Sequence, residues 1–216
     1  AGCPVLILTV DMVGASYRET QDRFMKQDDR DCAACHGEVR SPFRGRPMYD
    51  GIDLDAYLGA GERFDWGLVK KIKDTTDMKL IIKGITHPID AKLCVENGVD
   101  GLIVSNHGGR SQADSRGTIE ILPDVIKAVD GKIPVMVDGG IRRGSDIFKA
   151  LALGATAVDI GRPYLWGLGA FGQAGVERVL DIFDAELKLV MQQMGVTSIE
   201  QIKSSSLALP RGFAKS

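Results

Sequence analysis

The stretch Gly101-Leu102-Ile103-Val104-Ser105-Asn106-His107-Gly108-Gly109-Arg110 decides what fold we expect of this chain. Four apolar residues in a row are typical of a strand that is buried on both faces, as in a parallel sheet. The residues after that strand put the His107 imidazole three positions before the Arg110 guanidinium. Histidine moves protons near neutral pH, and arginine holds a carboxylate with a planar pair of N–H donors. This loop therefore predicts proton abstraction from a small carboxylic acid.

Apolar runs of the same kind recur along the chain and alternate with helical patterns. A helix is expected between Pro88 and Asn97, because proline favours the first turn of a helix and Asn-Gly favours its end. Such alternation predicts an α/β fold with a parallel sheet, either a (β/α)8 barrel or a doubly wound sheet. The expected strands cover residues 5–10, 79–83, 101–104, 135–137 and 157–160, and a final helix lies within residues 170–194.

Composition narrows the kind of partner. The chain has 216 residues, of which 44% are apolar, enough to bury a substantial core. Lys and Arg number 27 against 29 Asp and Glu, so the net charge of −2 gives no footprint for nucleic acid or an anionic membrane. No apolar run approaches the roughly 20 residues that span a bilayer, and the N-terminus has no secretory pattern. We expect a cytoplasmic protein that acts on a small molecule, and the presence of only four cysteines agrees with a reducing compartment.

Polar side chains follow the expected strands, where a parallel α/β fold places its chemistry. Asp11 follows the first strand, and Lys83 ends the second. Glycines lie beside arginines after the last two strands, in residues 138–144 and in Gly161-Arg162-Pro163. Backbone N–H groups approach a phosphate closely at such turns, and a guanidinium neutralises its charge. The two turns predict a phosphate site, and therefore a phosphorylated cofactor.

These motifs, in this order and spacing, resemble the FMN-dependent α-hydroxy-acid oxidases and dehydrogenases, the family of glycolate oxidase and L-lactate dehydrogenase. The resemblance covers residues 6–11, 82–84, 105–110, 138–146, 148–155 and 161–163. It implies a (β/α)8 TIM barrel, of which this chain supplies about the fourth to eighth strands. Residues 1–203 would form that C-terminal part of the barrel, with a variable insert at about 21–65, and residues 204–216 a flexible tail.

The resemblance also implies roles for individual residues. His107 matches the catalytic base and Asp11 its carboxylate partner, while Arg110 and Arg18 match the two arginines that grip the substrate carboxylate. Lys83 matches the lysine beside flavin N1, where negative charge gathers on reduction. The other positions that match FMN contacts are Thr9, Ser105, Asp138, Gly139, Gly140, Ile141, Arg142, Gly161 and Arg162.

The activity implied is FMN-dependent oxidation of an L-2-hydroxy acid, lactate-like or glycolate-like, to the 2-oxo acid. Oxygen, a quinone or a cytochrome would reoxidise the reduced flavin, and we expect a homo-oligomer. Nothing in the chain corresponds to the family's N-terminal half, so we expect a fragment of a longer enzyme. Two alternatives remain: another FMN barrel enzyme such as the isopentenyl-diphosphate isomerase type, or a non-catalytic fragment.

The expected insert contains Cys32-Ala33-Ala34-Cys35-His36, which has the spacing of a c-type haem attachment site. A Cys/Cys/His metal clip and a redox pair are further readings of Cys32, Cys35 and His36. Covalent haem attachment requires export, and the segment is short for a domain that encloses haem. We therefore expect plain loop cysteines here, with no metal.

Overall fold

The computed structural model describes residues 2–12, 19–27, 49–53, 64–111 and 116–213. The chain divides into two compact units, of which the larger combines Ala1–Gly14 with Val69–Ser216 and the smaller is Ala15–Leu68. Helix α1 (Glu19–Gln27) belongs to the smaller unit and has no buried residue. All of the chemistry described below lies in the larger unit.

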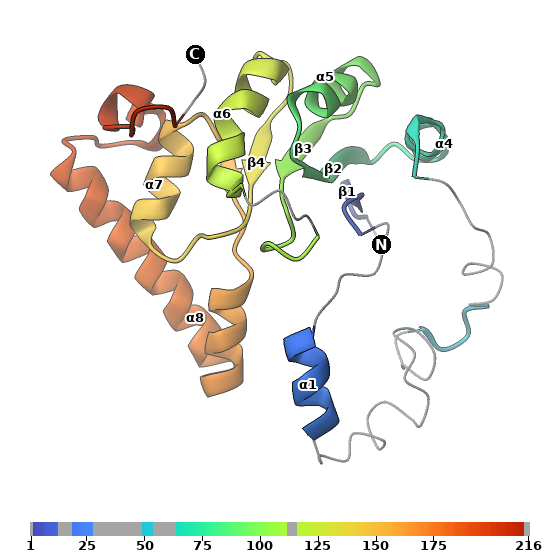
Figure 1. Cartoon of the computed structure of the whole chain (residues 1–216), viewed down its shortest axis with the longest axis horizontal. Helices are drawn as coiled ribbons and strands as arrows, with labels where there is room; N and C mark the ends of the chain where they lie inside the picture. The colour runs from blue at the N-terminus through green and yellow to red at the C-terminus, as the bar shows by residue number, and fades with distance from the viewer. Residues whose placement is uncertain (1, 13–18, 28–48, 54–63, 112–115, 214–216) are drawn as a thin grey trace. The chain divides into compact units, whose positions relative to one another are not determined.

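The larger unit is built on one sheet of five parallel strands in the order β1-β2-β3-β4-β5 (Figure 1). Each strand pairs with the next one along the chain, as expected when a helix connects consecutive strands. The predicted parallel α/β architecture is therefore confirmed. The strands are β1 (Val5–Thr9), β2 (Lys79–Ile85), β3 (Gly101–Val104), β4 (Val135–Val137) and β5 (Ala157–Val158).

Helices and strands alternate after β1, and their apolar faces meet in the core. The helices are α4 (Trp66–Thr75), α5 (Pro88–Glu96), α6 (Thr118–Val129), α7 (Gly144–Ala152) and α8 (Arg162–Gln193). Strand β3 is buried along its whole length, as its four apolar residues predict. The largest fully buried side chains come from β2, β3 and α6: Leu80, Ile82, Leu102, Ile103, Ile121 and Leu122.

The register places the carboxyl ends of the strands at one edge. Thr9 is level with Lys83, Val104 with Val137, and Val137 with Val158. The polar residues that directly follow these strands therefore leave the sheet from the same edge. This is the geometry that the sequence predicted for the site.

The predicted final helix, within residues 170–194, corresponds to the second part of a longer element. Helix α8 begins at Arg162, and Pro163 lies in its first turn, where a fixed φ and a missing N–H favour a helix start. Phe171 and Gly172 have non-helical backbone angles and divide α8 into two segments. Strand β5 ends at Val158, two residues before the predicted end.

The chain after α8 packs on α7. Ser204–Ser206 form a 3-10 helix, and Leu207 packs against the buried cluster of Phe148, Ala152 and Ile202. The division into a barrel portion ending at 203 and a flexible tail stays a prediction. Among the helices that the structure describes, none is both long and apolar enough to cross a membrane.

The amino-terminal ends of the strands are held by Asp100. Its carboxylate accepts hydrogen bonds from the Leu80 backbone N–H at 3.0 Å and from Lys73 Nζ at 2.9 Å, and Lys79 Nζ lies 3.2 Å away. The bond from the Leu80 amide, together with the two ammonium groups, lowers the pKa of Asp100 to about 2. The charged carboxylate thus ties α4 to β2 and to the start of β3.

Candidate active site

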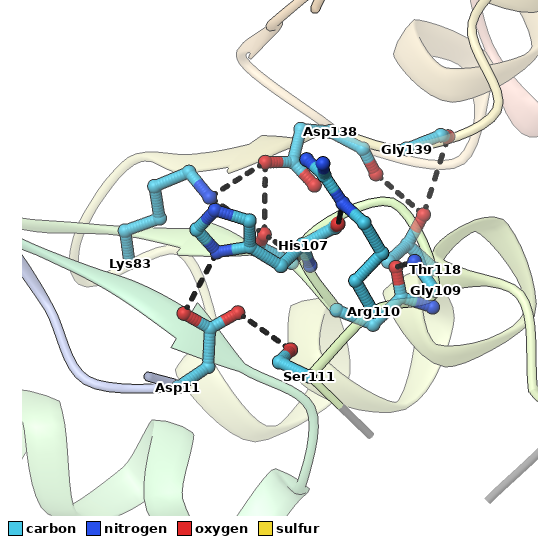
Figure 2. Close-up of polar contacts among 11 residues, drawn as sticks. Asp11, Lys83, His107, Gly109, Arg110, Ser111, Thr118, Asp138 and Gly139 are labelled. Atoms are coloured by element: carbon cyan, nitrogen blue, oxygen red, sulfur yellow. Dashed lines mark hydrogen bonds and ion pairs between the residues drawn. The ribbon is translucent and has the colours of Figure 1, made fainter. Parts of the chain in front are cut away.

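A histidine–aspartate pair lies at the carboxyl edge of the sheet. Asp11 follows β1, and His107 lies in the loop after β3, with His107 Nδ1 3.2 Å from Asp11 Oδ1 (Figure 2). The Asp11 side chain is 1% exposed, whereas the His107 side chain is 27% exposed. A buried carboxylate on Nδ1 orients the ring and stabilises its protonated form. Among the described residues, no hydrogen bond involves Nε2, the other nitrogen of the ring.

Asp11 comes this close to the sheet only because residue 84 is glycine. A Cβ at Gly84 would lie 2.7 Å from the Asp11 Cβ and 2.9 Å from its backbone nitrogen. Gly84 also has φ +112, a conformation that side chains disfavour, and it forms the bulge between β2 and β3. The glycine in Ile82-Lys83-Gly84 therefore makes room for the carboxylate that supports His107.

The loop that carries His107 is closed on itself. The Asn106 carbonyl accepts hydrogen bonds from the backbone N–H groups of Gly109, Arg110 and Ser111. His107 has φ +56, a left-handed conformation that costs a residue with a side chain about 1 kcal/mol or more. Arg110 Nε donates to the His107 carbonyl at 3.0 Å, which fixes the guanidinium beside the imidazole. An anion held by Arg110 would thus lie next to the His107 ring.

A lysine–serine–aspartate cluster lies beside this pair. Lys83 Nζ lies 2.8 Å from both Ser105 Oγ and Asp138 Oδ2, and Ser105 Oγ donates to the same carboxylate oxygen at 2.8 Å (Figure 2). Ser105 is fully buried, and its hydroxyl also accepts from the His107 backbone N–H. The cluster places a fixed positive charge among three strand ends. Such a charge stabilises negative charge that develops on a bound ring.

An anion site fits the N-terminus of α8 better than that of α7. The backbone N–H groups of Arg142 and Arg143 donate to Asp146 Oδ2, and that of Gly144 donates to Glu186 Oε2, so α7 is already capped. Glu186 also accepts a hydrogen bond from the Arg143 side chain. The bonds from the Gly144 amide and from Arg143 lower the pKa of Glu186. Gly161 provides no side-chain cap for α8. Free N–H groups at a helix start bind phosphate, which favours α8.

Two arginines lie near the start of α8. Arg162 Nη2 donates to the Gly108 carbonyl at 3.0 Å, which links the start of α8 to the His107 loop. The Arg142 guanidinium stacks 5.3 Å from the ring centre of Trp166, the fifth residue of α8. Both cations therefore lie close to the uncapped start of α8.

Two buried carboxylate oxygens have no partner within the described part of the chain, Asp138 Oδ1 and Asp159 Oδ2. Asp159 follows β5 at the level of Asp138, because its backbone N–H donates to the Val137 carbonyl at 2.9 Å. Burial and then the Asp138 charge raise the pKa of Asp159. Buried acceptors normally have donors, and the hydroxyls of a polyol supply donors of the right kind. The unpartnered oxygens, Lys83 and the open start of α8 fit a group that combines a polyol chain with a phosphate, as FMN does.

The predicted site residues that the structure describes gather at this one edge. Asp11, His107 and Arg110 form one cluster, and Lys83, Ser105 and Asp138 form the neighbouring one. Thr9 ends β1 level with Lys83, and Gly139, Gly140 and Ile141 follow Asp138 toward the arginines. Arg18 and the Cys32, Cys35 and His36 motif lie outside the described residues. Among the described residues there is no group of His, Cys, Asp or Glu that could hold a metal ion.

Three residues of the site were not predicted from the sequence. Ser111 Oγ donates to Asp11 Oδ2 at 2.9 Å, and Thr118 Oγ1 donates to the Asp138 and Gly139 carbonyls. Asp159 directly precedes Ile160-Gly161, one strand along from Asp138. Asp159 lay inside the predicted strand 157–160, and only the earlier end of β5 at Val158 places it after a strand, as Asp138 is after the fourth. Ser111 and Thr118 carried no comparable signal, because both act through contacts with residues far away in the sequence.

The sheet and this edge define a parallel α/β protein whose ligand site lies at the carboxyl ends of the strands. A family model described as FMN-dependent dehydrogenase matches residues 1–209, so the chain belongs to the FMN-dependent dehydrogenase family. An L-lactate oxidase of Lysinibacillus sphaericus is 49% identical over 99% of this chain and 56% of its own length. A peroxisomal (S)-2-hydroxyacid oxidase of Arabidopsis thaliana is 38% identical over 94% of this chain and 55% of its own length.

Solved structures give the same picture of the fold. A mandelate oxidase variant with an FMN adduct has a TM-score of 0.74 and 33% identity, and the match covers 94% of this chain and 55% of that one. A flavocytochrome b2 variant with bound pyruvate has a TM-score of 0.74 and 30% identity over 96% of this chain and 48% of that one. Both are TIM-barrel proteins, which confirms the predicted fold class. The chain spans about half the length of the curated relatives it matches.

Proposed function

We propose that the protein carrying this chain is an FMN-dependent oxidoreductase that converts an L-2-hydroxy acid to the 2-oxo acid. The observation that carries the proposal is the contact of His107 with the buried Asp11, beside Arg110 in the same loop. Family membership and the relatives named for lactate and 2-hydroxyacid oxidation support it. A substrate with a carboxylate next to a hydroxyl carbon matches an arginine next to a base.

FMN is the cofactor that we propose for the neighbouring cluster. The unpartnered oxygens of Asp138 and Asp159 would accept from the ribityl hydroxyls, with Gly139, Gly140 and Ile141 lining that part of the site. The start of α8 at Gly161, with Arg162 and Arg142, would hold the phosphate. Lys83 Nζ, with Ser105, would face the part of the ring where negative charge gathers, and Thr9 would lie beside it. When bound, FMN supplies a two-electron acceptor for the hydrogen on the substrate's α-carbon.

His107 acts as the base in this proposal. Its Nε2 would take the proton of the substrate hydroxyl as the α-hydrogen leaves with its bonding electrons, and Asp11 would stabilise the resulting imidazolium through Nδ1. Arg110 grips the substrate carboxylate with both terminal nitrogens, and Arg18 is its proposed partner in that task. Because Arg110 is fixed to the His107 carbonyl, binding of the carboxylate brings the α-carbon next to the base.

The proposal is tested by mixing the complete protein, expressed with all of the sequence that its gene encodes, with L-lactate or glycolate without oxygen. The visible flavin absorption should bleach rapidly, and His107→Ala should retain the flavin spectrum but lose the bleaching. A flavin that no 2-hydroxy acid reduces would contradict the proposal and favour an isomerase-type barrel. A well-folded, colourless protein that binds no added FMN would favour a non-catalytic role.

Several finer assignments belong to the same proposal. We place the enzyme in the cytoplasm, while one relative is named peroxisomal. We propose a homo-oligomer, with oxygen, a quinone or a cytochrome as the electron acceptor. Reoxidation of the reduced protein by air, measured against a soluble quinone and cytochrome c, assigns the acceptor class.

A further inference from the structure

We propose that Ser111 is a positioning residue for the catalytic pair, because its hydroxyl fixes the buried Asp11 carboxylate in the orientation that His107 needs. The inference rests on the proposed function, since it takes His107 as the base. Ser111 itself touches neither the imidazole nor, in this proposal, the substrate. Its effect on the reaction passes through Asp11.

The two oxygens of Asp11 have one donor each from the same loop. Oδ1 lies 3.2 Å from His107 Nδ1, and Oδ2 accepts from Ser111 Oγ at 2.9 Å (Figure 2). The Asp11 side chain is 1% exposed, so bulk water does not reach Oδ2 to replace a lost donor. A buried carboxylate without a second donor pays the full cost of desolvating that oxygen. It can also rotate about its own χ2 and take Oδ1 out of line with the imidazole.

Ser111 is a well-fixed donor. Its backbone N–H bonds the Asn106 carbonyl, the same oxygen that accepts from Gly109 and Arg110. The Asn106 side-chain oxygen accepts from the Gly109 N–H at 2.9 Å and strengthens the closed loop. The backbone that carries the Ser111 hydroxyl is therefore fixed by hydrogen bonds within the loop.

His107 and Ser111 lie at opposite ends of this turn, and one carboxylate bonds both. Asp11 thus links β1 to two points of the loop after β3. One bond would leave the loop free to pivot about the His107–Asp11 contact, whereas two bonds fix its rotation. That fixed rotation matters because His107 holds a costly left-handed backbone.

The effect of losing the hydroxyl falls on the chemical step. Arg110 and its bond to the His107 carbonyl remain, so substrate still binds with its carboxylate in place. The imidazole, however, is held less firmly, and a misoriented base transfers a proton slowly. We expect the rate of flavin reduction to fall while KM stays near its original value. A fall of about 10- to 100-fold is the range given by one hydrogen bond to a charged group.

The test compares Ser111→Ala with Ser111→Thr in the complete FMN-loaded protein. The alanine variant should lower the limiting rate of flavin reduction in stopped flow by about 10- to 100-fold. The threonine variant keeps the hydroxyl and should return the rate to within about threefold of the original. KM and the FMN dissociation constant, from quenching of FMN fluorescence, should stay nearly unchanged in both, while Tm should fall in the alanine variant and stay near the original in the threonine variant. Ser205→Ala, at an exposed serine of the last 3-10 helix, is the matched control and should change none of these.

Two results would overturn the inference. One is an alanine variant that reduces flavin at the original rate while His107→Ala is inactive, since the base would then need no help from Ser111. The other is equal loss in the alanine and threonine variants together with a lower Tm, which would make Ser111 a packing residue. A His107→Ala variant that still reduces flavin would instead contradict the proposed function on which the inference rests.

Discussion

Two aspartates lie at opposite ends of the strands of the same sheet. Both carboxylates are held by several donors, but the donors differ in kind. Asp100, at the amino ends of the strands, accepts from one backbone amide and faces the cations of Lys73 and Lys79. Asp11, at the carboxyl ends, faces an imidazole and a hydroxyl. The partners of Asp100 are ammonium groups, which form ion pairs, whereas imidazole is the side-chain group that most often acts as a general base. The same carboxylate chemistry thus serves stability at one end and, in the proposed mechanism, proton transfer at the other.

The largest effect is expected when the imidazole is removed from the carboxyl end. His107→Ala should lower the rate of flavin reduction by at least about 1000-fold, because no other described side chain can take the proton in its place. FMN should stay bound and Tm should change little, since the side chain is partly exposed. The measurement is stopped-flow bleaching with L-lactate beside the static flavin spectrum. Loss of the flavin itself would assign His107 a structural role.

A smaller effect on the same end is expected from Arg110→Lys. An ammonium is a point charge and cannot hold a carboxylate with two parallel bonds, so kcat/KM should fall by about 10- to 100-fold, chiefly through KM. Steady-state rates over a range of substrate concentrations give the two constants separately. Unchanged constants would place the substrate carboxylate away from Arg110.

At the amino end the effect should appear in stability instead of rate. Asp100→Asn should lower the free energy of unfolding by about 1–2 kcal/mol at pH 7. Asparagine carries no negative charge, so the backbone amide and the two ammonium groups lose the carboxylate that they stabilise. The folded pKa of about 2 lies below the ordinary aspartate value of 3.8, so this stability is present above about pH 4 and disappears as the pH falls toward 2. Urea unfolding of both proteins at a series of pH values tests this. The flavin reduction rate should stay the same, and a slower rate would break the division between the two ends.

The smallest effect is expected for Asp159→Asn in protein freed of FMN. Burial raises the pKa of Asp159, so the folded state takes up its proton more readily than the unfolded state does. Ionised Asp159 therefore opposes folding as the pH rises through the folded pKa, and asparagine removes that opposition. The variant should gain stability at pH 8 and gain less at pH 4. Urea midpoints at the two pH values give the difference, and an equal change at both would show that the charge is not the cause.

The sequence alone predicted the sheet well and the fine contacts poorly. The four apolar residues of β3 and the glycine–arginine turns after β4 and β5 carry local signals, so the parallel fold and the edge that holds the site followed from them. The part of α8 before Phe171 was missed, because Gly161-Arg162-Pro163 was interpreted as a phosphate-binding turn, although Pro163 also marks a helix start. Ser111 was missed because a serine hydroxyl signals nothing until β1 brings Asp11 within 2.9 Å of it.

Gly84 makes the functional end of the sheet unusually sensitive to a change in a residue without any chemistry. Any side chain there would meet the Asp11 Cβ at 2.7 Å and would also have to adopt φ +112. In a saturation mutagenesis screen scored on growth or turnover, position 84 should therefore tolerate as few substitutions as position 107. A variant at this glycine found in a genome would be read as inactivating, although the amino acid changed takes no part in the reaction.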